Sequence, residues 1–220
     1  MSRVRFKVCC IADPDEAALA IAAGASALGL VSTMPSGPGV IDEAMIAEIA
    51  ARIPPGIATF LLTALTDAEA IIEQHRRCRT TTLQLVDRVE PAEHRRLRQA
   101  LPGIGLVQVI HVLDEASVSE ACELAPSVDA LLLDSGNPRL PTKSLGGTGQ
   151  THDWALSRRI VEQAGKPVWL AGGLNADNLA DAVAAVRPFG LDLCSSLRVD
   201  GRLNDERLQR FAAAVHAAAA

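Results

Sequence analysis

The sequence predicts a single (β/α)8 barrel, or TIM barrel, in which eight parallel strands alternate with eight helices. Eight short apolar runs recur along the 220 residues, and each is followed by a longer segment with helical periodicity. The run Leu131-Leu132-Leu133 has no polar alternation, which is typical of parallel strands that are buried on both faces. An open, doubly wound sheet remains the alternative, because periodicity does not report whether a sheet closes.

Each predicted strand is a short apolar run bounded by polar or glycine-containing breaks. The strands are Arg5 to Val8, Ala27 to Val31, Ile57 to Leu62, Thr82 to Leu85, Leu106 to His111, Ala130 to Leu133, Val168 to Ala171 and Leu191 to Cys194. The helices that follow them are Asp13 to Ala23, Glu43 to Arg52, Asp67 to Arg77, Pro91 to Ala100, Glu115 to Ala125, Trp154 to Ala164, Ala176 to Val186 and Asp205 to Ala218.

Capping residues support several of these helix starts. An N-cap side chain accepts hydrogen bonds from the first free amides of a helix, and proline fits the first helical turn. Such signals are Asp13 before Pro14, Thr66 before Asp67 and Glu69, and Asn175 before Asp177. No linker rich in proline or serine divides the chain, so we expect one domain over residues 1–220. We expect the alanine-rich end, residues 212–220, to be a frayed helix terminus or a disordered tail.

Composition and charge exclude several classes of protein. Hydrophobic residues make up 49% of the chain, which is ample for a buried core. With 21 Lys and Arg against 26 Asp and Glu, the net charge is −5, which argues against a nucleic-acid partner and against binding to an anionic membrane.

The uncharged stretch from Ala17 to Ile41 is rich in alanine and glycine and contains two prolines. We interpret it as helix, turn, strand and loop rather than as a membrane span.

The cysteines and the first residues of the chain predict a cytoplasmic location. The five cysteines are odd in number and mostly far apart, which does not suggest a disulfide framework. After the cations of residues 1–7, acidic residues interrupt the apolar stretch before a secretory signal core can form. No pair of His, Cys or carboxylate residues has metal-ligand spacing, so we expect no metal.

In a TIM barrel the chemistry takes place at the carboxyl ends of the strands and in the loops that follow. Polar residues and glycines at those positions are Cys9, Cys10, Asp134, Gly172, Gly173, Cys194, Ser195 and Ser196. Each also has a structural explanation, since a buried cysteine commonly packs in a core and an aspartate commonly caps a turn.

Two glycine-rich segments suggest a phosphate site. Glycine lets backbone amides approach an anion closely, and TIM barrels often bind phosphate in the seventh and eighth loops. The segment Ala171–Asn175 suits this role, and Gly146–Gly149 offers further amides. The second segment is not a Walker loop, because Gln150 occupies the position of the required lysine.

The chain resembles the phosphoribosylanthranilate isomerase family. The resemblance rests on motifs that occur in the family's order over most of the chain. They are Lys7-Val8-Cys9-Cys10-Ile11, Gly24 to Gly29, Leu132-Leu133-Asp134-Ser135, Gly146-Gly147-Thr148-Gly149 with Asp153-Trp154, Leu170 to Asn175, and Arg187 to Asp192. Any one of these motifs is weak, but their ordered combination is specific.

The resemblance implies a cofactor-free Amadori rearrangement in tryptophan biosynthesis that converts N-(5′-phosphoribosyl)anthranilate into its 1-deoxyribulose phosphate isomer. It assigns the general base to Cys9 and the general acid to Asp134. An acid that protonates the ribose ring oxygen opens the ring to an iminium, and a thiolate then removes the acidified C2′ proton. The family's phosphate contacts correspond to Gly147, Gly172, Gly173 and Ser195. The implied partner is a small phosphorylated substrate, and no oligomeric state is predicted.

The chain departs from the family pattern at four places. Ser36-Gly37-Pro38 replaces Ser-Pro-Arg, whose arginine contacts the anthranilate carboxylate in the family. Val86 and Asp87 replace His-Gly after the fourth strand, and Cys10 replaces a glycine. Cys194 to Arg198 reads Cys-Ser-Ser-Leu-Arg where the family has Ser-Ser-Gly-Val-Glu. These changes affect substrate recognition more than the acid and the base.

Because the arginine of the family's Ser-Pro-Arg motif is absent, the sequence leaves open how the substrate carboxylate is bound and which substrate is used. Arg198 or Arg139 is a possible substitute cation for the substrate carboxylate. The alternatives are a divergent paralogue that acts on another N-phosphoribosyl or sugar-phosphate substrate, and a non-catalytic barrel that binds a phosphorylated metabolite or a partner protein.

Overall fold

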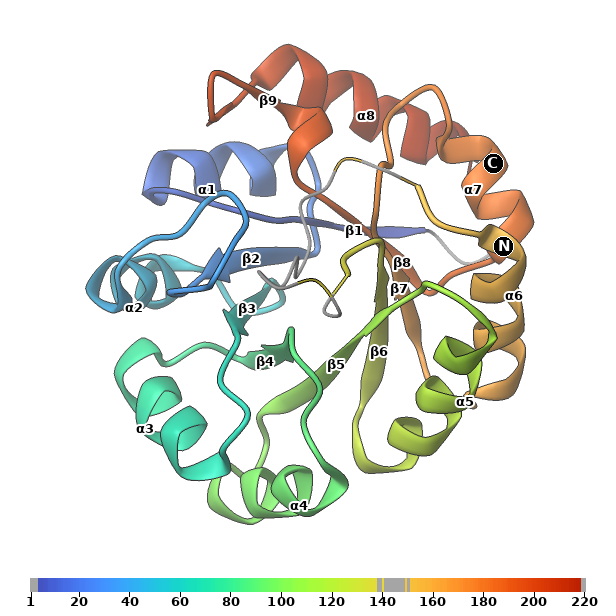
Figure 1. Ribbon diagram of the computed structural model, residues 1–220. Helices are drawn as coiled ribbons and strands as arrows, with labels where there is room; N and C mark the ends of the chain where they lie inside the picture. The colour runs from blue at the N-terminus through green and yellow to red at the C-terminus, as the bar shows by residue number, and fades with distance from the viewer. Residues whose placement is uncertain (1–3, 138–139, 141–148, 150, 219–220) are drawn as a thin grey trace.

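Eight parallel strands close into a barrel that is surrounded by eight helices (Figure 1). The computed structural model describes residues 4–137, 140, 149 and 151–218. The strands are β1 (Arg5–Val8), β2 (Ala27–Val31), β3 (Ala58–Thr63), β4 (Thr82–Leu85), β5 (Gly105–His111), β6 (Ala130–Asp134), β7 (Val168–Leu170) and β8 (Gly190–Leu193). The helices are α1 (Pro14–Ala22), α2 (Glu43–Arg52), α3 (Ala68–Cys78), α4 (Pro91–Ala100), α5 (Glu115–Leu124), α6 (Trp154–Gln163), α7 (Leu179–Val186) and α8 (Asp205–Ala218).

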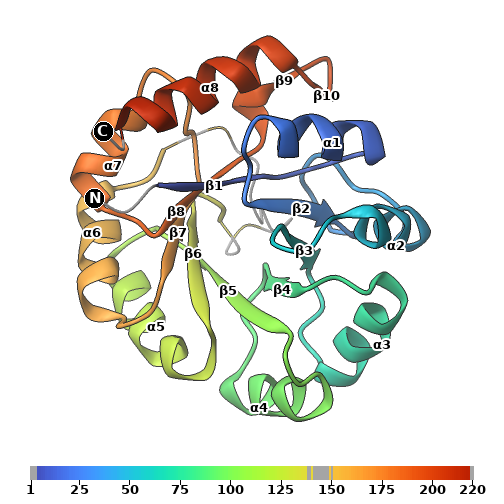
Figure 2. The same ribbon diagram turned by 180° about the vertical axis from the view of Figure 1, so that it is seen from behind.

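Pairing between the first and last strands completes the barrel. In β1 and β8, Lys7 pairs with Asp192 and Val8 with Leu193. The view from behind shows the same ring of helices outside the strands (Figure 2). The predicted TIM barrel is confirmed and the open sheet is excluded, because an open sheet would leave these two strands unpaired.

Aspartate caps account for most of the predicted helix starts. The carboxylates of Asp13, Asp42, Asp67, Asp114 and Asp153 each accept a hydrogen bond from an amide in the first turn of α1, α2, α3, α5 and α6. These bonds satisfy amides that have no partner within the helix.

Helix α7 begins at Leu179, three residues later than the sequence predicts. The Asn175 side chain accepts from the amides of Asp177 and Asn178, and the Asn178 side chain accepts from the amide of Asn175. These local bonds hold the segment as a turn and compete with helix formation.

The sequence pattern does not predict a short hairpin after β8. Strands β9 (Arg198–Val199) and β10 (Arg202–Leu203) are antiparallel, and Asp200 and Gly201 join them with positive φ angles of 50° and 78°. Positive φ at both central residues matches the twist of a tight hairpin. Strands of two residues are too short to produce a recognisable period, so sequence analysis misses them.

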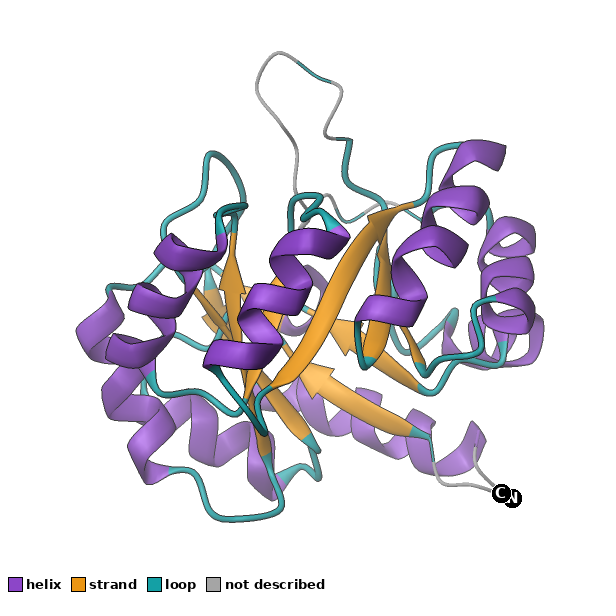
Figure 3. Cartoon of the chain, turned by 90° about the horizontal axis from the view of Figure 1, so that it is seen from below, coloured by secondary structure: helices purple, strands orange, loops and turns teal. Residues whose placement is uncertain are grey.

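Apolar side chains fill two layers of the molecule. The larger layer lies between the strands and the helices, and a smaller cluster fills the inside of the barrel. Figure 3 shows the strands enclosed by helices. In the inner cluster, the Trp169 ring packs edge-on against Phe60 and Phe189, with centroids 5.9 and 5.5 Å away. Cys9 and Cys10 belong to this inner cluster, so both lie inside the barrel wall.

The alanine-rich end is helical through Ala218. In α8, Phe211, Ala212 and Val215 are buried, and the Phe211 ring lies 5.8 Å from Phe6 at the start of the barrel. Residues 211–215 therefore pack against the barrel, and the helix continues through Ala218. None of the helices over the described residues is long and apolar enough to span a membrane.

A nearly buried ion pair ties the β9–β10 hairpin to α1. The Arg198 Nη2 lies 3.0 Å from Glu16 Oε2, and the two side chains are 8% and 6% exposed. Glu16 also accepts from the amides of Leu203 (2.8 Å) and Ala12 (3.0 Å). Burial raises the pKa of Glu16, but hydrogen bonds from Arg198 and from these two amides outweigh it, so the pKa lies below its usual range.

We expect Gly190→Ala to destabilise the protein by about 1–3 kcal/mol, because a Cβ on Gly190 would lie 2.6 Å from the Trp169 ring. Urea unfolding measures the change. Gly105→Ala is the matched control in another strand. Its nearest neighbour is a Thr82 side-chain oxygen at 3.1 Å, so the loss should be smaller. Equal losses in the two variants would contradict the packing argument.

Glu16→Gln should lower the free energy of unfolding by about 3 kcal/mol near pH 7, because it leaves the Arg198 charge buried without its counter-ion. The lowered pKa of Glu16 stabilises the fold above the ordinary glutamate value of about 4.3, and this contribution is lost as the pH falls through the folded pKa. The difference between wild type and variant should therefore shrink in acid.

Glu48→Gln is the control for this prediction. Glu48 forms an exposed pair with Arg52, and such a pair contributes about 0.5 kcal/mol or less. A Glu16→Gln variant as stable as Glu48→Gln at neutral pH would show that the Glu16–Arg198 pair does not hold the hairpin.

Candidate active site

A pocket that is open to solvent lies at the carboxyl ends of the strands. It is lined by strand ends and by the loops that follow β1, β2, β6, β7 and β8. The lining residues that the sequence analysis singled out are Cys9, Cys10, Asp134, Gly172, Gly173, Cys194, Ser195 and Ser196. The barrel therefore brings together residues from both halves of the chain.

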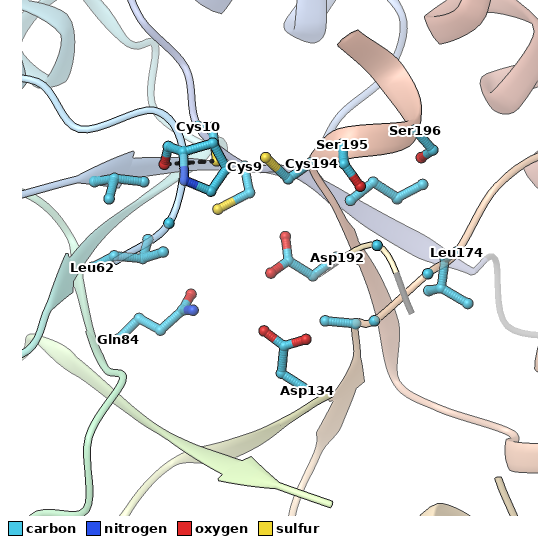
Figure 4. A pocket seen from close by; sticks show the side chains of 18 of the residues that line it. Cys9, Cys10, Leu62, Gln84, Asp134, Leu174, Asp192, Cys194, Ser195 and Ser196 are labelled. Atoms are coloured by element: carbon cyan, nitrogen blue, oxygen red, sulfur yellow. Dashed lines mark hydrogen bonds between the residues drawn. The ribbon is translucent and has the colours of Figure 1, made fainter. Parts of the chain in front are cut away.

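Cys9 and Asp134 face the same cavity (Figure 4). Cys9 follows β1 and is 6% exposed, and its amide donates to the Leu193 carbonyl at 2.7 Å. Asp134 is the last residue of β6 and is half-buried, and its Oδ1 accepts from the Ser135 amide at 2.7 Å. One thiol and one carboxyl group thus converge on the pocket from different strands.

Gly29 of β2 leaves the space that Cys9 occupies. A Cβ added to Gly29 would lie 2.7 Å from the Cys9 Sγ and 3.2 Å from the Lys7 Cε. Any side chain at this position would collide with the sulfur. Cys9 and Lys7 therefore pack side by side against the same point of the neighbouring strand.

Lys7 and Asp192 form an ion pair beneath the pocket. The Lys7 Nζ lies 2.7 Å from Asp192 Oδ1, and the side chains are 0% and 7% exposed. Burial opposes the charge on Lys7, but the attraction of Asp192 and of Cys9 raises its pKa above the usual range. Burial also raises the pKa of Asp192; Lys7 opposes this rise, and Asp134 adds to it.

Asp192 and Gln84 are pocket residues to which the sequence analysis gave no role. Asp192 interrupts an apolar strand, and that position is the signal that could have identified it. Gln84 of β4 is 3% exposed and points into the pocket (Figure 4). Its Oε1 is buried and has no hydrogen-bond partner in the described part of the chain. A buried amide in this state can hydrogen-bond a polar ligand.

The expected phosphate residues gather on one side of the pocket. Gly172 and Gly173 follow β7 with φ angles of 81° and 62°, a conformation that glycine adopts without strain. Ser195 begins the short 3-10 helix η2 (Ser195–Leu197) after β8. A Cβ on Gly149 would lie 3.6 Å from the Ser195 hydroxyl, so the sixth loop reaches the eighth. Gly147 lies outside the described residues.

Arg198 does not line the pocket, which argues against the suggested role as a cation for the substrate carboxylate. Its guanidinium is paired with Glu16 and donates to the carbonyls of Cys9, Cys10 and Gly201. These buried contacts direct the charge into the wall of the barrel rather than toward a ligand. Arg139, the other suggested cation, lies outside the described residues.

The altered second and fourth loops differ in their relation to the pocket. Ser36, Gly37 and Pro38 line it, whereas Val86 is buried in the wall and Asp87 lines a separate, smaller pocket. Over the described part of the lining there is no Lys, Arg or His, and the charged groups are the two carboxylates. A phosphate in this pocket would therefore rely on amide and hydroxyl donors from that part of the wall.

Comparisons with known proteins agree with this geometry. Residues 6–214 match the family model described as N-(5′phosphoribosyl)anthranilate (PRA) isomerase. N-(5′-phosphoribosyl)anthranilate isomerase of Haloferax volcanii is 36% identical over 217 residues, covering 97% of this chain and 94% of that protein. The same enzyme of Methanocella arvoryzae is 32% identical over 206 residues, covering 94% of each chain.

Solved structures show the same fold. Phosphoribosyl anthranilate isomerase from Thermus thermophilus superposes with a TM-score of 0.81 at 25% identity and covers 97% of this chain and 99% of its own. The Thermotoga maritima structure gives a TM-score of 0.83 at 24% identity with the same coverage. The chain belongs to the N-(5′-phosphoribosyl)anthranilate isomerase family and is an aldose–ketose isomerase of tryptophan biosynthesis.

Proposed function

We propose that this chain converts N-(5′-phosphoribosyl)anthranilate into 1-(2-carboxyphenylamino)-1-deoxyribulose 5-phosphate, with Cys9 as general base and Asp134 as general acid. The observation that carries the proposal is that both side chains face one pocket beside the glycine-rich loops. The reaction needs only proton transfers, and a thiolate with a carboxylic acid can supply them.

The mechanism follows from where the two groups lie. Asp134 donates a proton to the ribose ring oxygen, the C1′–O bond breaks, and the nitrogen lone pair forms the iminium. The Cys9 thiolate then takes the proton from C2′, and the electrons of that C–H bond neutralise the iminium as an enol-amine. The Cys9 thiol then protonates C1′, and the C2′ hydroxyl proton passes to the Asp134 carboxylate, which gives the ketone and returns both groups to their starting protonation states. The ring oxygen and C2′ of the substrate are both bonded to C1′. The acid and the base must therefore lie close together, as they do in one pocket.

Backbone amides are the proposed phosphate donors. Within the described residues, no backbone carbonyl accepts from the amides of Gly172 and Gly173. Ser195 follows β8, the strand next to β7, and carries a hydroxyl beside Gly149. In the described part of the pocket these donors are neutral, so a phosphate there would be held by amide and hydroxyl groups.

Lys7 is proposed as a positioning residue for the base. Its ammonium group is fully buried, and it is attracted by both Asp192 and the Cys9 sulfur. Lys7 packs beside Cys9 against Gly29 of the neighbouring strand, so it holds the Cys9 side chain in place next to the pocket. Asp192 raises the pKa of Lys7 and so keeps Lys7 charged.

The described part of the pocket supports a second candidate, a divergent isomerase with another aglycone. Ser36, Gly37 and Pro38 stand where the resemblance expects an arginine for the anthranilate carboxylate, and no cation lines the described wall. Growth of a tryptophan auxotroph that lacks the isomerase decides between the two. Growth on expression of this chain supports the proposed substrate, and failure by a folded, expressed protein favours another one.

Replacing either catalytic group should abolish most of the activity. We expect Cys9→Ser and Asp134→Asn each to lower kcat by about 100- to 10,000-fold, because each variant lacks one proton-transfer group. Steady-state turnover of N-(5′-phosphoribosyl)anthranilate measures this, and binding of inorganic phosphate should persist. Cys122→Ser, on the surface at α5, is the control with unchanged kcat. A variant of Cys9 or Asp134 that retains half the activity would refute the assigned role.

Breaking the Lys7–Asp192 pair should destabilise the fold. Lys7→Met leaves the nearly buried Asp192 charge without its counter-ion, so the free energy of unfolding should fall by about 3 kcal/mol. Urea unfolding measures the change, and Arg52→Met, which breaks the exposed pair with Glu48, is the control. Equal losses in the two variants would contradict the importance of the buried pair.

A further inference from the structure

A glutamine side chain points into the pocket from β4 with its carbonyl oxygen unpaired. Gln84 is 3% exposed and lines the pocket, and its buried Oε1 has no hydrogen-bond partner among the described residues. Figure 4 shows the amide directed toward the centre of the pocket, with Leu62 beside it. The proposed proton transfers use Cys9 and Asp134, so they leave Gln84 without a role.

The neighbours of Gln84 on the inner wall of the barrel are apolar. In the strand register, Gln84 pairs with Leu62 of β3 and with Val107 of β5, and both belong to the apolar cluster inside the barrel. A buried carbonyl oxygen that receives no hydrogen bond destabilises the fold. Packing therefore does not explain an amide at this position, whereas a ligand that supplies a donor does.

Gln108 on the neighbouring strand β5 has the contacts of a structural glutamine. It is fully buried and does not line the pocket. Its Nε2 donates to three backbone carbonyls at 2.9 to 3.1 Å, and its Oε1 accepts from the Val89 amide at 3.3 Å. The fold thus uses both ends of the Gln108 amide, while the Oε1 of Gln84 remains for a ligand.

The order of strands places Gln84 opposite the proposed phosphate site. In the closed ring of eight strands, β4 lies four strands from β8, and β3 lies four strands from β7. A substrate whose phosphate is held after β7 and β8 therefore extends toward β3 and β4. The 5′-phosphate and the nitrogen on C1′ lie at opposite ends of the ribose, so this nitrogen faces the side of the pocket that carries Gln84.

We propose that Gln84 Oε1 accepts a hydrogen bond from the N–H that joins the aglycone to C1′, an inference that rests on the proposed function. When the ribose ring opens, C1′ and this nitrogen share the positive charge of the iminium, and the N–H becomes a stronger donor. A fixed carbonyl dipole that points at this charge stabilises the transition state more than the neutral substrate. Gln84 is then a catalytic residue that neither gives nor takes a proton.

The other side-chain carboxylates in the described part of the lining have different tasks. Asp134 gives its proton to the ring oxygen in the proposed reaction, and Asp192 is paired with Lys7. The Gln84 amide adds an acceptor without adding a charge. A neutral acceptor suits this position because a third carboxylate would repel the two aspartates and an anionic substrate.

Steady-state kinetics of Gln84→Met tests the role in catalysis, because methionine matches glutamine in length and lacks the carbonyl oxygen. We expect kcat for N-(5′-phosphoribosyl)anthranilate to fall about 5- to 30-fold, while KM rises by no more than about fivefold, since the hydrogen bond strengthens as the iminium forms. Gln84→Glu keeps an oxygen at this position and should recover part of the lost kcat. A rise in KM alone, or a lower kcat in Gln84→Glu than in Gln84→Met, would overturn the proposal.

Urea unfolding separates this role from a structural one. Gln84→Met removes an unpaired buried oxygen, so its unfolding midpoint should equal or exceed that of the wild type. Gln108→Met is the matched control, and it should lower the midpoint because it leaves the former partners of the amide buried without hydrogen bonds. A loss of stability in Gln84→Met as large as that in Gln108→Met would assign Gln84 to the fold and reject the catalytic role.

Binding of a stable analogue tests the contact without turnover. The proposed product with its ketone reduced to an alcohol keeps the aglycone, the N–H and the phosphate. Isothermal titration calorimetry should show its Kd rising about 2- to 5-fold in Gln84→Met, with the affinity for inorganic phosphate unchanged. Equal Kd values in the two proteins would overturn the contact. A wild type that binds the analogue but does not turn over the substrate would reject the proposed function, and the ratio of the two Kd values would still decide the Gln84 contact.

Discussion

The Lys7–Asp192 ion pair lies at the point where the barrel closes, and the arrangement of the site depends on it. Lys7 is on the first strand and Asp192 on the last, and both are almost fully removed from water. Neither charge is tolerated there without the other, because an unpaired charge in a protein interior is very costly. The pair thus holds the seam in the register from which Cys9 and Cys194, each two residues further along, reach the pocket.

The pocket brings two kinds of polar group together. Carboxylates and thiols come from the ends of β1, β6 and β8, and the glycine amides proposed for phosphate follow β7, which lies between β6 and β8 in the barrel. Two buried cations lie near the base without lining the described part of the pocket. Lys7 packs beside Cys9 and is paired with Asp192, and Arg198 donates to the Cys9 carbonyl and is paired with Glu16. Each positive charge is already matched by a carboxylate, so neither is directed at a ligand.

The role of Arg198 depends on its surroundings in the folded chain. From the sequence it is a cation after the eighth strand, at the correct end of the barrel to meet a substrate. In the structure it is paired with Glu16, holds the β9–β10 hairpin, and lies beside Cys194. A substrate-binding arginine and an arginine paired within the wall have the same residue type and the same position along the chain. They differ only in the direction of the side chain, which the sequence does not record.

The sequence by itself determined the alternation of eight strands with eight helices, most element boundaries, and Cys9, Asp134 and the glycines as strand-end residues, because apolar periodicity and capping are local properties of the chain. Tertiary structure alone decided that β1 meets β8 to close the barrel, that Lys7 pairs with Asp192, and that Arg198 pairs with Glu16. Strand closure joins residues about 185 positions apart, and no local pattern records which distant side chains will share a buried site.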